Sequence, residues 1–144
     1  EEITAAVEGK IWNWYNINVG NPHAVVFVEK IEDVGSLKDA PVVRPKDAYP
    51  EGVNVEFVEI MPNHEAKMRV HERGSGETKS CGTGTCAVAL AATMQMKEKL
   101  PARWVIYPPG GRLVVDIDPH SNATLTGPAL LISDHDLTPF LQDA

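Results

Sequence analysis

Cys81 has a glycine-rich turn on either side and a long apolar segment after them, and these residue types together can do chemistry at sulfur. The stretch from Glu72 to Lys97 reads ERGSGETKSCGTGTCAVALAATMQMK, with no charged residue between Lys79 and Lys97. The apolar run predicts a helix that begins at Cys81 and is buried on most of its faces. The unpaired N–H groups and the positive dipole end of a helix N-terminus favour both a thiolate and a bound anion. We therefore predict a reactive thiol beside a turn that binds a carboxylate.

Two other side chains are candidates for proton transfer near this thiol. Glu72 continues the apolar face of an expected strand over residues 66–73, so its carboxylate should point towards the interior or a cleft. His23 follows a tight turn at Gly20 to Pro22 and stands at the head of another expected strand. An isolated histidine in such a position can also be purely structural.

Two nucleotide-binding motifs are partly matched and are rejected on their context. A phosphate-binding loop requires its lysine to follow a glycine, whereas Thr78 precedes Lys79 here. The GxGxxA pattern from Gly82 to Ala87 resembles a dinucleotide fingerprint, but a polar loop precedes it where a buried strand is needed.

Other roles for Cys81 stay open from the residues alone. A cysteine hydrolase needs a histidine base, and a non-enzymatic anion-binding module would use the same helix start. The available histidines are His23, His64, His71, His120 and His135. They show no i, i+4 pairing, so the pattern does not favour a metal enzyme.

The composition is that of one globular domain in a reducing compartment. The 144 residues are 43% hydrophobic and 23% charged, with a net charge of −7 that argues against nucleic acid or an anionic membrane as partners. The two cysteines, Cys81 and Cys86, form neither a disulfide framework nor a zinc site, so a cytoplasmic setting is expected. The uncharged run from Cys86 to Met96 is too short to span a bilayer.

Hydrophobic alternation predicts about nine strands around one helix. The expected strands are residues 3–9, 11–20, 24–30, 54–60, 66–73, 103–107, 112–118, 123–127 and 128–133. Residues 31–52 are expected to form a surface connection and residues 134–144 a terminal extension. A doubly wound sheet would need a helix after each strand. We therefore predict an α+β fold in which antiparallel strands wrap as a barrel-like sheet around one central hydrophobic helix.

Three motifs, in this order along the chain, resemble the diaminopimelate epimerase family. They are GNPH at Gly20 to His23, Asn54 at the head of NVEFVEI, and ERGSGETKSCGTGT at Glu72 to Thr85. Proline racemases share a CGTGT-like element, but the ERGSGET segment is similar to the diaminopimelate enzymes. The resemblance implies that residues 1–144 are a single C-terminal catalytic half-domain, the second of two pseudo-symmetric halves. The first residue, Glu1 and not Met, also suggests a piece of a longer protein.

The resemblance implies a cofactor-independent and metal-free stereoinversion that interconverts LL- and meso-diaminopimelate in lysine and peptidoglycan precursor synthesis. Two thiols act on opposite faces of the α-carbon. Cys81 matches one of them, and Glu72 and His23 match groups that assist the thiols. The implied substrate-binding residues are Asn21, Asn54, Glu72, Arg73, Gly82 and Thr83.

The second catalytic cysteine of the family belongs to the N-terminal half. Cys86 cannot replace it, because a residue inside the helix would not face the opposite side of the substrate, and it is expected to be core packing. The resemblance thus implies that this chain alone does not epimerise. Its expected partners are diaminopimelate and the N-terminal half of the enzyme, with a homodimer also expected from the family. The alternatives are a proline racemase-like enzyme of the same fold, or a non-catalytic anion-binding domain.

Overall fold

The computed structural model describes residues 4–136, and these form eleven strands, one α-helix and one 3-10 turn. In chain order the elements are β1 (Thr4–Val7), β2 (Lys10–Asn13), β3 (Tyr15–Asn18), β4 (Pro22–Phe27), the 3-10 turn η1 (Ile31–Val34), β5 (Val42–Arg44), β6 (Asn54–Met61), β7 (Glu65–Glu72), β8 (Gly76–Thr78), α1 (Gly82–Gln95), β9 (Ala102–Tyr107), β10 (Leu113–Ile117) and β11 (Ala123–Thr126).

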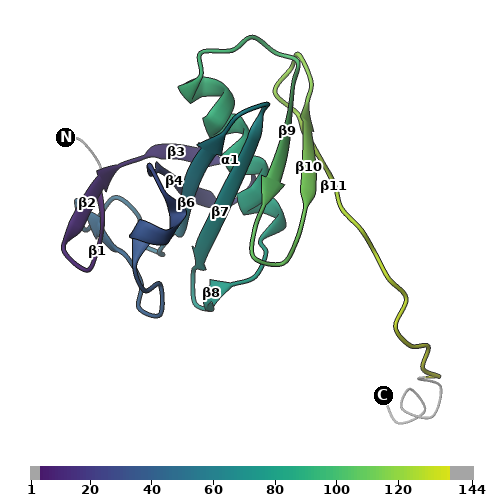
Figure 1. Cartoon of the computed structure of the whole chain (residues 1–144). Helices are drawn as coiled ribbons and strands as arrows, with labels where there is room; N and C mark the ends of the chain where they lie inside the picture. The colour runs from purple at the N-terminus through teal and green to yellow at the C-terminus, as the bar shows by residue number, and fades with distance from the viewer. Residues whose placement is uncertain (1–3, 137–144) are drawn as a thin grey trace.

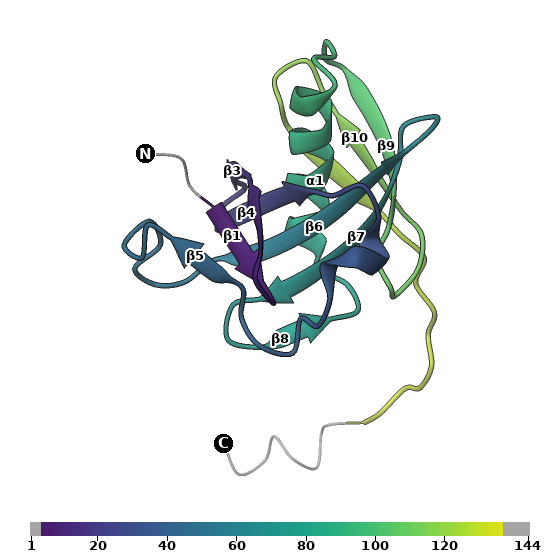
Figure 2. The same ribbon diagram turned by 60° about the vertical axis from the view of Figure 1, so that its left-hand side comes forward.

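Two sheets lie on either side of one layer of core residues. The main sheet has the order β11-β10-β9-β7-β6-β4-β3, with β8 paired to the end of β7. It curls around α1, which contacts strands at both of its edges and in its middle (Figure 1). The small sheet β2-β1-β5 packs on the opposite face, over β4 and β6 (Figure 2). The predicted α+β fold with a curled sheet around one helix is confirmed.

Two strand pairings in the main sheet are parallel, although the sequence suggested antiparallel strands throughout. β4 pairs with β6, and β7 pairs with β9, in parallel register. Parallel neighbours need a crossover connection, and α1 is the crossover between β7 and β9. The start of α1 therefore lies close to the end of β7, which is the geometry that positions the candidate site.

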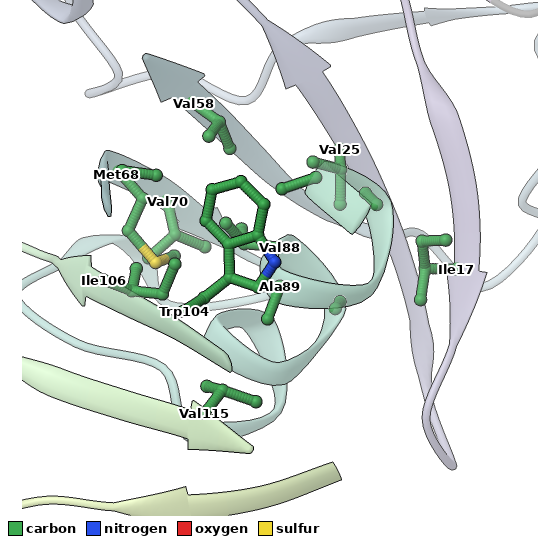
Figure 3. Packing of buried hydrophobic residues seen from close by; sticks show 14 of the residues in the cluster. Ile17, Val25, Val58, Met68, Val70, Val88, Ala89, Trp104, Ile106 and Val115 are labelled. Atoms are coloured by element: carbon green, nitrogen blue, oxygen red, sulfur yellow. The ribbon is translucent and has the colours of Figure 1, made fainter. Parts of the chain in front are cut away.

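Small side chains allow the sheet to pack closely against α1. Ala87, Val88, Ala91 and Ala92 are fully buried, and the helix lies among side chains from several strands (Figure 3). The surrounding residues labelled there include Val25, Val58, Met68, Val70, Trp104, Ile106 and Val115. The predicted burial of most helix faces is confirmed, but the stripe of Cys86, Leu90 and Met94 is half-buried or exposed because the sheet does not close over it. Within residues 4–136, no helix is long and apolar enough to cross a membrane.

Some predicted elements differ from the structure. Residues 11–20 form two strands, β2 and β3, which belong to different sheets. Strand β5 lies within the expected surface connection, and the short β8 was not predicted. Residues 128–133 are not a strand: they are exposed and run away from the body of the molecule (Figure 1). The predicted terminal extension is described only to residue 136, and residues 137–144 lie outside the described part.

A buried hydrogen bond fastens α1 to β9 and gives a test of the core. Trp104 Nε1 donates to Thr93 Oγ1 at 2.9 Å, and Thr93 Oγ1 donates to Ala89 O at 2.9 Å. Thr93→Val would leave the indole N–H buried without an acceptor, which is expected to lower the free energy of unfolding by about 1–3 kcal/mol. Urea unfolding would measure this loss. Thr124→Val, at an exposed position of β11, is the control and should change stability by less than about 0.5 kcal/mol; equal losses would contradict the account.

Candidate functional site

Cys81 is the residue that caps the start of α1, as predicted. Its backbone is extended, with φ −135° and ψ 113°, and the helix begins at Gly82. Cys81 Sγ accepts a hydrogen bond from Gly84 N at 3.4 Å, and Cys81 O accepts from Thr85 N and Thr85 Oγ1, both at 2.8 Å. Sulfur thus occupies the position usually taken by the oxygen of Ser, Thr or Asp.

A series of polar side chains connects Cys81 with the interior of the sheet. Cys81 Sγ is 3.6 Å from Thr83 Oγ1, and Asn21 Nδ2 donates to Thr83 Oγ1 at 3.5 Å. Asn21 Oδ1 lies 3.1 Å from His23 Nε2. His23 Nδ1 lies 2.6 Å from Glu56 Oε1. The structure therefore brings four predicted site residues, namely Cys81, Thr83, Asn21 and His23, into one hydrogen-bonded group.

The parallel pairing of β4 with β6 makes this group possible. His23 is opposite Asn54 in the register, and Val25 is opposite Glu56. Residues two apart on a strand share a face, so His23 and Glu56 both face the start of α1. The turn before β4 then places Asn21 between His23 and the helix.

Glu56 is the residue of this group that the sequence did not reveal. It is fully buried, as is His23, and its Oε2 has no hydrogen-bond partner among the described residues. Burial raises the pKa of Glu56, His23 lowers that pKa in part through its hydrogen bond and charge, and the charge of Glu72 raises it further. The alternating pattern of NVEFVEI predicted a strand but assigned no role to Glu56. Both faces of β6 are in fact covered, one by α1 and the other by the small sheet.

Gly84 permits the close contact between α1 and Glu56. A Cβ atom at Gly84 would lie 2.7 Å from Glu56 Oε1 and 3.2 Å from Cys81 Sγ. One point in the first turn of the helix therefore borders both the thiol and the buried carboxyl group. A side chain at this position would have to displace one of them.

Glu72 and Asn54 lie at the ends of neighbouring strands. Thr78 Oγ1 donates to Glu72 Oε1, and the Glu72 side chain is half-buried. Asn54 Oδ1 accepts from Arg73 N at 2.9 Å, and Asn54 Nδ2 donates to Pro22 O at 3.4 Å. The Asn54 amide thus joins the ends of β4, β6 and β7 through backbone groups.

The Arg73 side chain is directed to a different place from the group around Cys81. Arg73 Nη1 donates to Glu51 O at 3.2 Å. Arg73 also lines a hollow of about 260 Å³ together with Tyr49 and His71. The structure therefore does not bring this predicted carboxylate ligand to the thiol.

A wider hollow of about 610 Å³ begins at the exposed first turn of α1. Gly82 and Thr83 lie at its edge, and Cys86 and Leu90 line it along the helix. The remaining lining residues are Asn18, Val19, Ser121, Asn122, Ala123 and Leu125. Cys86 packs against the core, as predicted, but it is only half-buried and also borders this hollow. Burial raises the pKa of the Cys86 thiol, and the nearby Cys81 raises it further.

Residues that could hold a metal do not come together in the part of the chain that the structure describes: no group of three or more His, Cys, Asp or Glu is found there. Of the five histidines proposed as bases, His23 is the one joined to Cys81 by the hydrogen bonds above. His64 instead bonds to Glu98 at 2.9 Å.

Comparison with known proteins agrees with this arrangement. The family model described as "Diaminopimelate epimerase" matches residues 15–132. The chain belongs to the diaminopimelate epimerase family. The family resemblance predicted from the three sequence motifs is thus confirmed.

Relatives within the family are about twice as long as this chain. The diaminopimelate epimerase of Streptomyces coelicolor is 45% identical over 139 residues, which cover 92% of this chain and 48% of the relative. That of Geobacillus sp. (strain WCH70) is 39% identical over 123 residues, which cover 85% and 43%. The chain therefore spans about half the length of these curated relatives.

A solved structure shares the fold. The Bacillus anthracis phenazine biosynthesis protein of the PhzF family aligns with a TM-score of 0.51 and 16% identity, covering 87% of this chain and 40% of that one. At this level of identity the likeness concerns the fold alone.

Replacement of Gly84 tests the contact between α1 and Glu56. Gly84→Ala is expected to lower the free energy of unfolding by about 1–3 kcal/mol, although Ala is favoured over Gly in helices, because the methyl group would press on Glu56 Oε1. Gly82→Ala is the matched control, since its Cβ would lie 3.4 Å from Leu125 Cδ2, an ordinary contact. Urea unfolding would measure both. A Gly84→Ala protein as stable as the unaltered chain would contradict this packing.

Two glutamates of β6 are expected to respond to pH with opposite signs. Burial raises the pKa of Glu56, so its favourable contribution to stability is complete at low pH and is lost as the pH rises from the unfolded value, about 4.3, through the native one. The hydrogen bond from Ile31 N lowers the pKa of Glu59, so its contribution is present above the unfolded value and is lost as the pH falls through the native one.

Urea unfolding at a series of pH values would separate these two contributions. Glu56→Gln should flatten the loss of stability at rising pH, and Glu59→Gln should flatten the loss at falling pH. The same sign of change in both variants would contradict the assignment.

Proposed function

We propose that this chain supplies one of the two thiols of a cofactor-independent epimerase that interconverts LL- and meso-diaminopimelate. The observation that carries the proposal is Cys81 at the start of a buried helix, with Gly84 N directed at its sulfur. Membership of the diaminopimelate epimerase family and the names of the curated relatives support the choice of substrate.

The reaction asks for proton transfer at a weakly acidic carbon. As a thiolate, Cys81 takes the α-proton onto sulfur while a thiol on the opposite face gives its proton to the same carbon, and in the reverse direction the two exchange roles. Negative charge that develops next to the α-carboxylate is stabilised by the N–H groups at the start of α1. Gly82 and Thr83 are the residues that present these groups beside the hollow.

The remaining predicted residues have distinct roles in this proposal. Asn21 and Thr83 contact the amino-acid head group, and His23, which is fully buried, acts through them and does not touch substrate. Asn54 holds the strand ends together. Glu72, which accepts a hydrogen bond from Thr78 Oγ1, assists the thiols in proton transfer and binds the substrate ammonium group in this proposal. Arg73 is exposed, so its guanidinium can leave Glu51 O and bind the distal carboxylate of the substrate in a bidentate manner.

The second thiol comes from an N-terminal half of the same enzyme in this proposal. The match to about half the length of the relatives supports a single half-domain, and the resemblance of the three motifs makes it the C-terminal one in this proposal. Cys86 lies five residues beyond Cys81, on the flank of the helix, and cannot reach the opposite face of a substrate held at the helix start. The proposal includes a cytoplasmic location and, in the whole enzyme, a homodimer.

Exchange of the substrate α-proton with deuterium oxide tests the function. This chain would be inserted into the Streptomyces coelicolor relative in place of its aligned segment, and exchange and epimer conversion would be measured for the hybrid and for the chain alone. The hybrid should exchange and convert diaminopimelate, whereas the chain alone should do neither. Cys81→Ser in the hybrid should lower exchange by at least about a hundredfold because the proton acceptor is lost.

Cys86→Ser in the same hybrid is the matched control and should keep both activities. A hybrid that binds diaminopimelate without exchanging its proton would favour an anion-binding module over an epimerase. Full activity of the chain alone would contradict the requirement for a second half.

A further inference from the structure

The hydrogen bonds between Glu56 and Cys81 have directions that depend on one another. Asn21 Oδ1 can only accept and Asn21 Nδ2 can only donate. Because Oδ1 faces His23 Nε2 at 3.1 Å, that ring nitrogen must carry a hydrogen. Thr83 Oγ1 accepts from Asn21 Nδ2, so its own hydrogen is free to be donated to Cys81 Sγ, 3.6 Å away. In this arrangement every donor points towards the sulfur.

This direction holds only while the Glu56 and His23 pair keeps a proton. One hydrogen lies between His23 Nδ1 and Glu56 Oε1, and a second lies on His23 Nε2. Loss of a proton to solvent leaves a carboxylate beside a neutral ring, and the remaining ring hydrogen then lies on Nδ1, next to the negative oxygen. His23 Nε2 becomes an acceptor, so Asn21 must rotate its amide. Thr83 then donates to Asn21 Oδ1 and no longer to the sulfur.

The surroundings of Glu56 favour retention of that proton. Glu56 and His23 are both 0% exposed, and Glu56 Oε2 has no hydrogen-bond partner among the described residues. The titratable groups around Glu56 are His23, Glu72, Tyr49 and Cys81. Of these, Glu72 and a Cys81 thiolate carry negative charge, which opposes ionisation of the buried carboxyl group.

We propose that Glu56 is a positioning residue: the proton that it shares with His23 sets the direction of the hydrogen bonds across Asn21 and Thr83. That direction decides whether Thr83 donates a hydrogen bond to the Cys81 sulfur. This inference deepens the proposed function and rests on it for its meaning in catalysis. Glu56 does not touch substrate. Its protonated pair favours the thiolate that abstracts the α-proton, and the deprotonated pair withdraws a donor from that thiolate.

The pH dependence of Cys81 alkylation by iodoacetamide tests the inference without substrate. The measurement uses the 144-residue chain carrying Cys86→Ser, so that one thiol reports. In Glu56→Gln the side chain cannot ionise, and its amide nitrogen donates to His23 Nδ1 because the reverse orientation would bury both N–H bonds where Oε2 has no partner among the described residues. The hydrogen bonds therefore stay directed at sulfur. The midpoint of alkylation should move to lower pH, with about threefold faster reaction on the rising limb. Thr83→Val should slow alkylation by about threefold because the final donor is lost.

The double variant and a control on the same strand distinguish this effect from a general loss of structure. Glu56→Gln should no longer accelerate alkylation when combined with Thr83→Val, because the effect requires the hydroxyl group. Glu59→Gln, which removes a charge on β6 that pairs with Lys67, should leave the midpoint unchanged. An unchanged midpoint in Glu56→Gln, or an equal effect with and without Thr83, would overturn the proposal.

A measurement on the chain without substitutions covers the case in which Glu56→Gln does not fold. Nitrogen-15 NMR of the His23 ring should find a hydrogen on Nε2 at neutral pH, and an Nε2 without hydrogen would overturn the proposal. Failure of the epimerase assignment would instead appear as absent α-proton exchange in the hybrid enzyme, so the two failures are distinguishable.

Discussion

The contact between the first turn of α1 and the buried carboxyl group of Glu56 is the constraint on which the rest of the structure depends. Gly84 allows the helix to approach β6 so closely that the same turn touches Glu56 and caps itself with the Cys81 sulfur. The crossover from β7 to β9 directs the helix start to this point, and small side chains keep the helix close to the sheet along its length. The placement of the thiol is therefore a result of the packing of the whole half-barrel.

A buried acid and base are costly unless they satisfy each other. The short contact between His23 and Glu56 supplies one partner to each, and the Asn21 amide supplies the second partner of His23. A network of this kind fixes side-chain directions more strictly than apolar packing does, because a small displacement breaks a bond that water cannot replace. A rigid thiol suits a reaction in which proton transfer depends on alignment with one carbon atom.

The sequence reveals those features that depend on local pattern. Glycines before an apolar run were sufficient to place Cys81 at the helix start, and the turn before β4 correctly placed His23 at the head of that strand. Features that depend on distant segments were missed. Alternation in β6 could not show that both of its faces are covered, with Glu56 on the face that α1 covers and Val55 and Phe57 under the small sheet. Nor could the sequence show that the Arg73 guanidinium binds Glu51 O, because that contact depends on the loop before β6.

The segment after β11 affects the association between chains but not the stability of the folded chain. Leu130, Leu131 and Ile132 are 85%, 86% and 89% exposed, so they contribute almost nothing to the conformational stability of residues 4–136. The same three side chains form an uncharged, β-prone run, which is the composition that drives association between chains. The core thus sets the conformational stability of the chain, whereas this exposed run favours association between chains without affecting that stability.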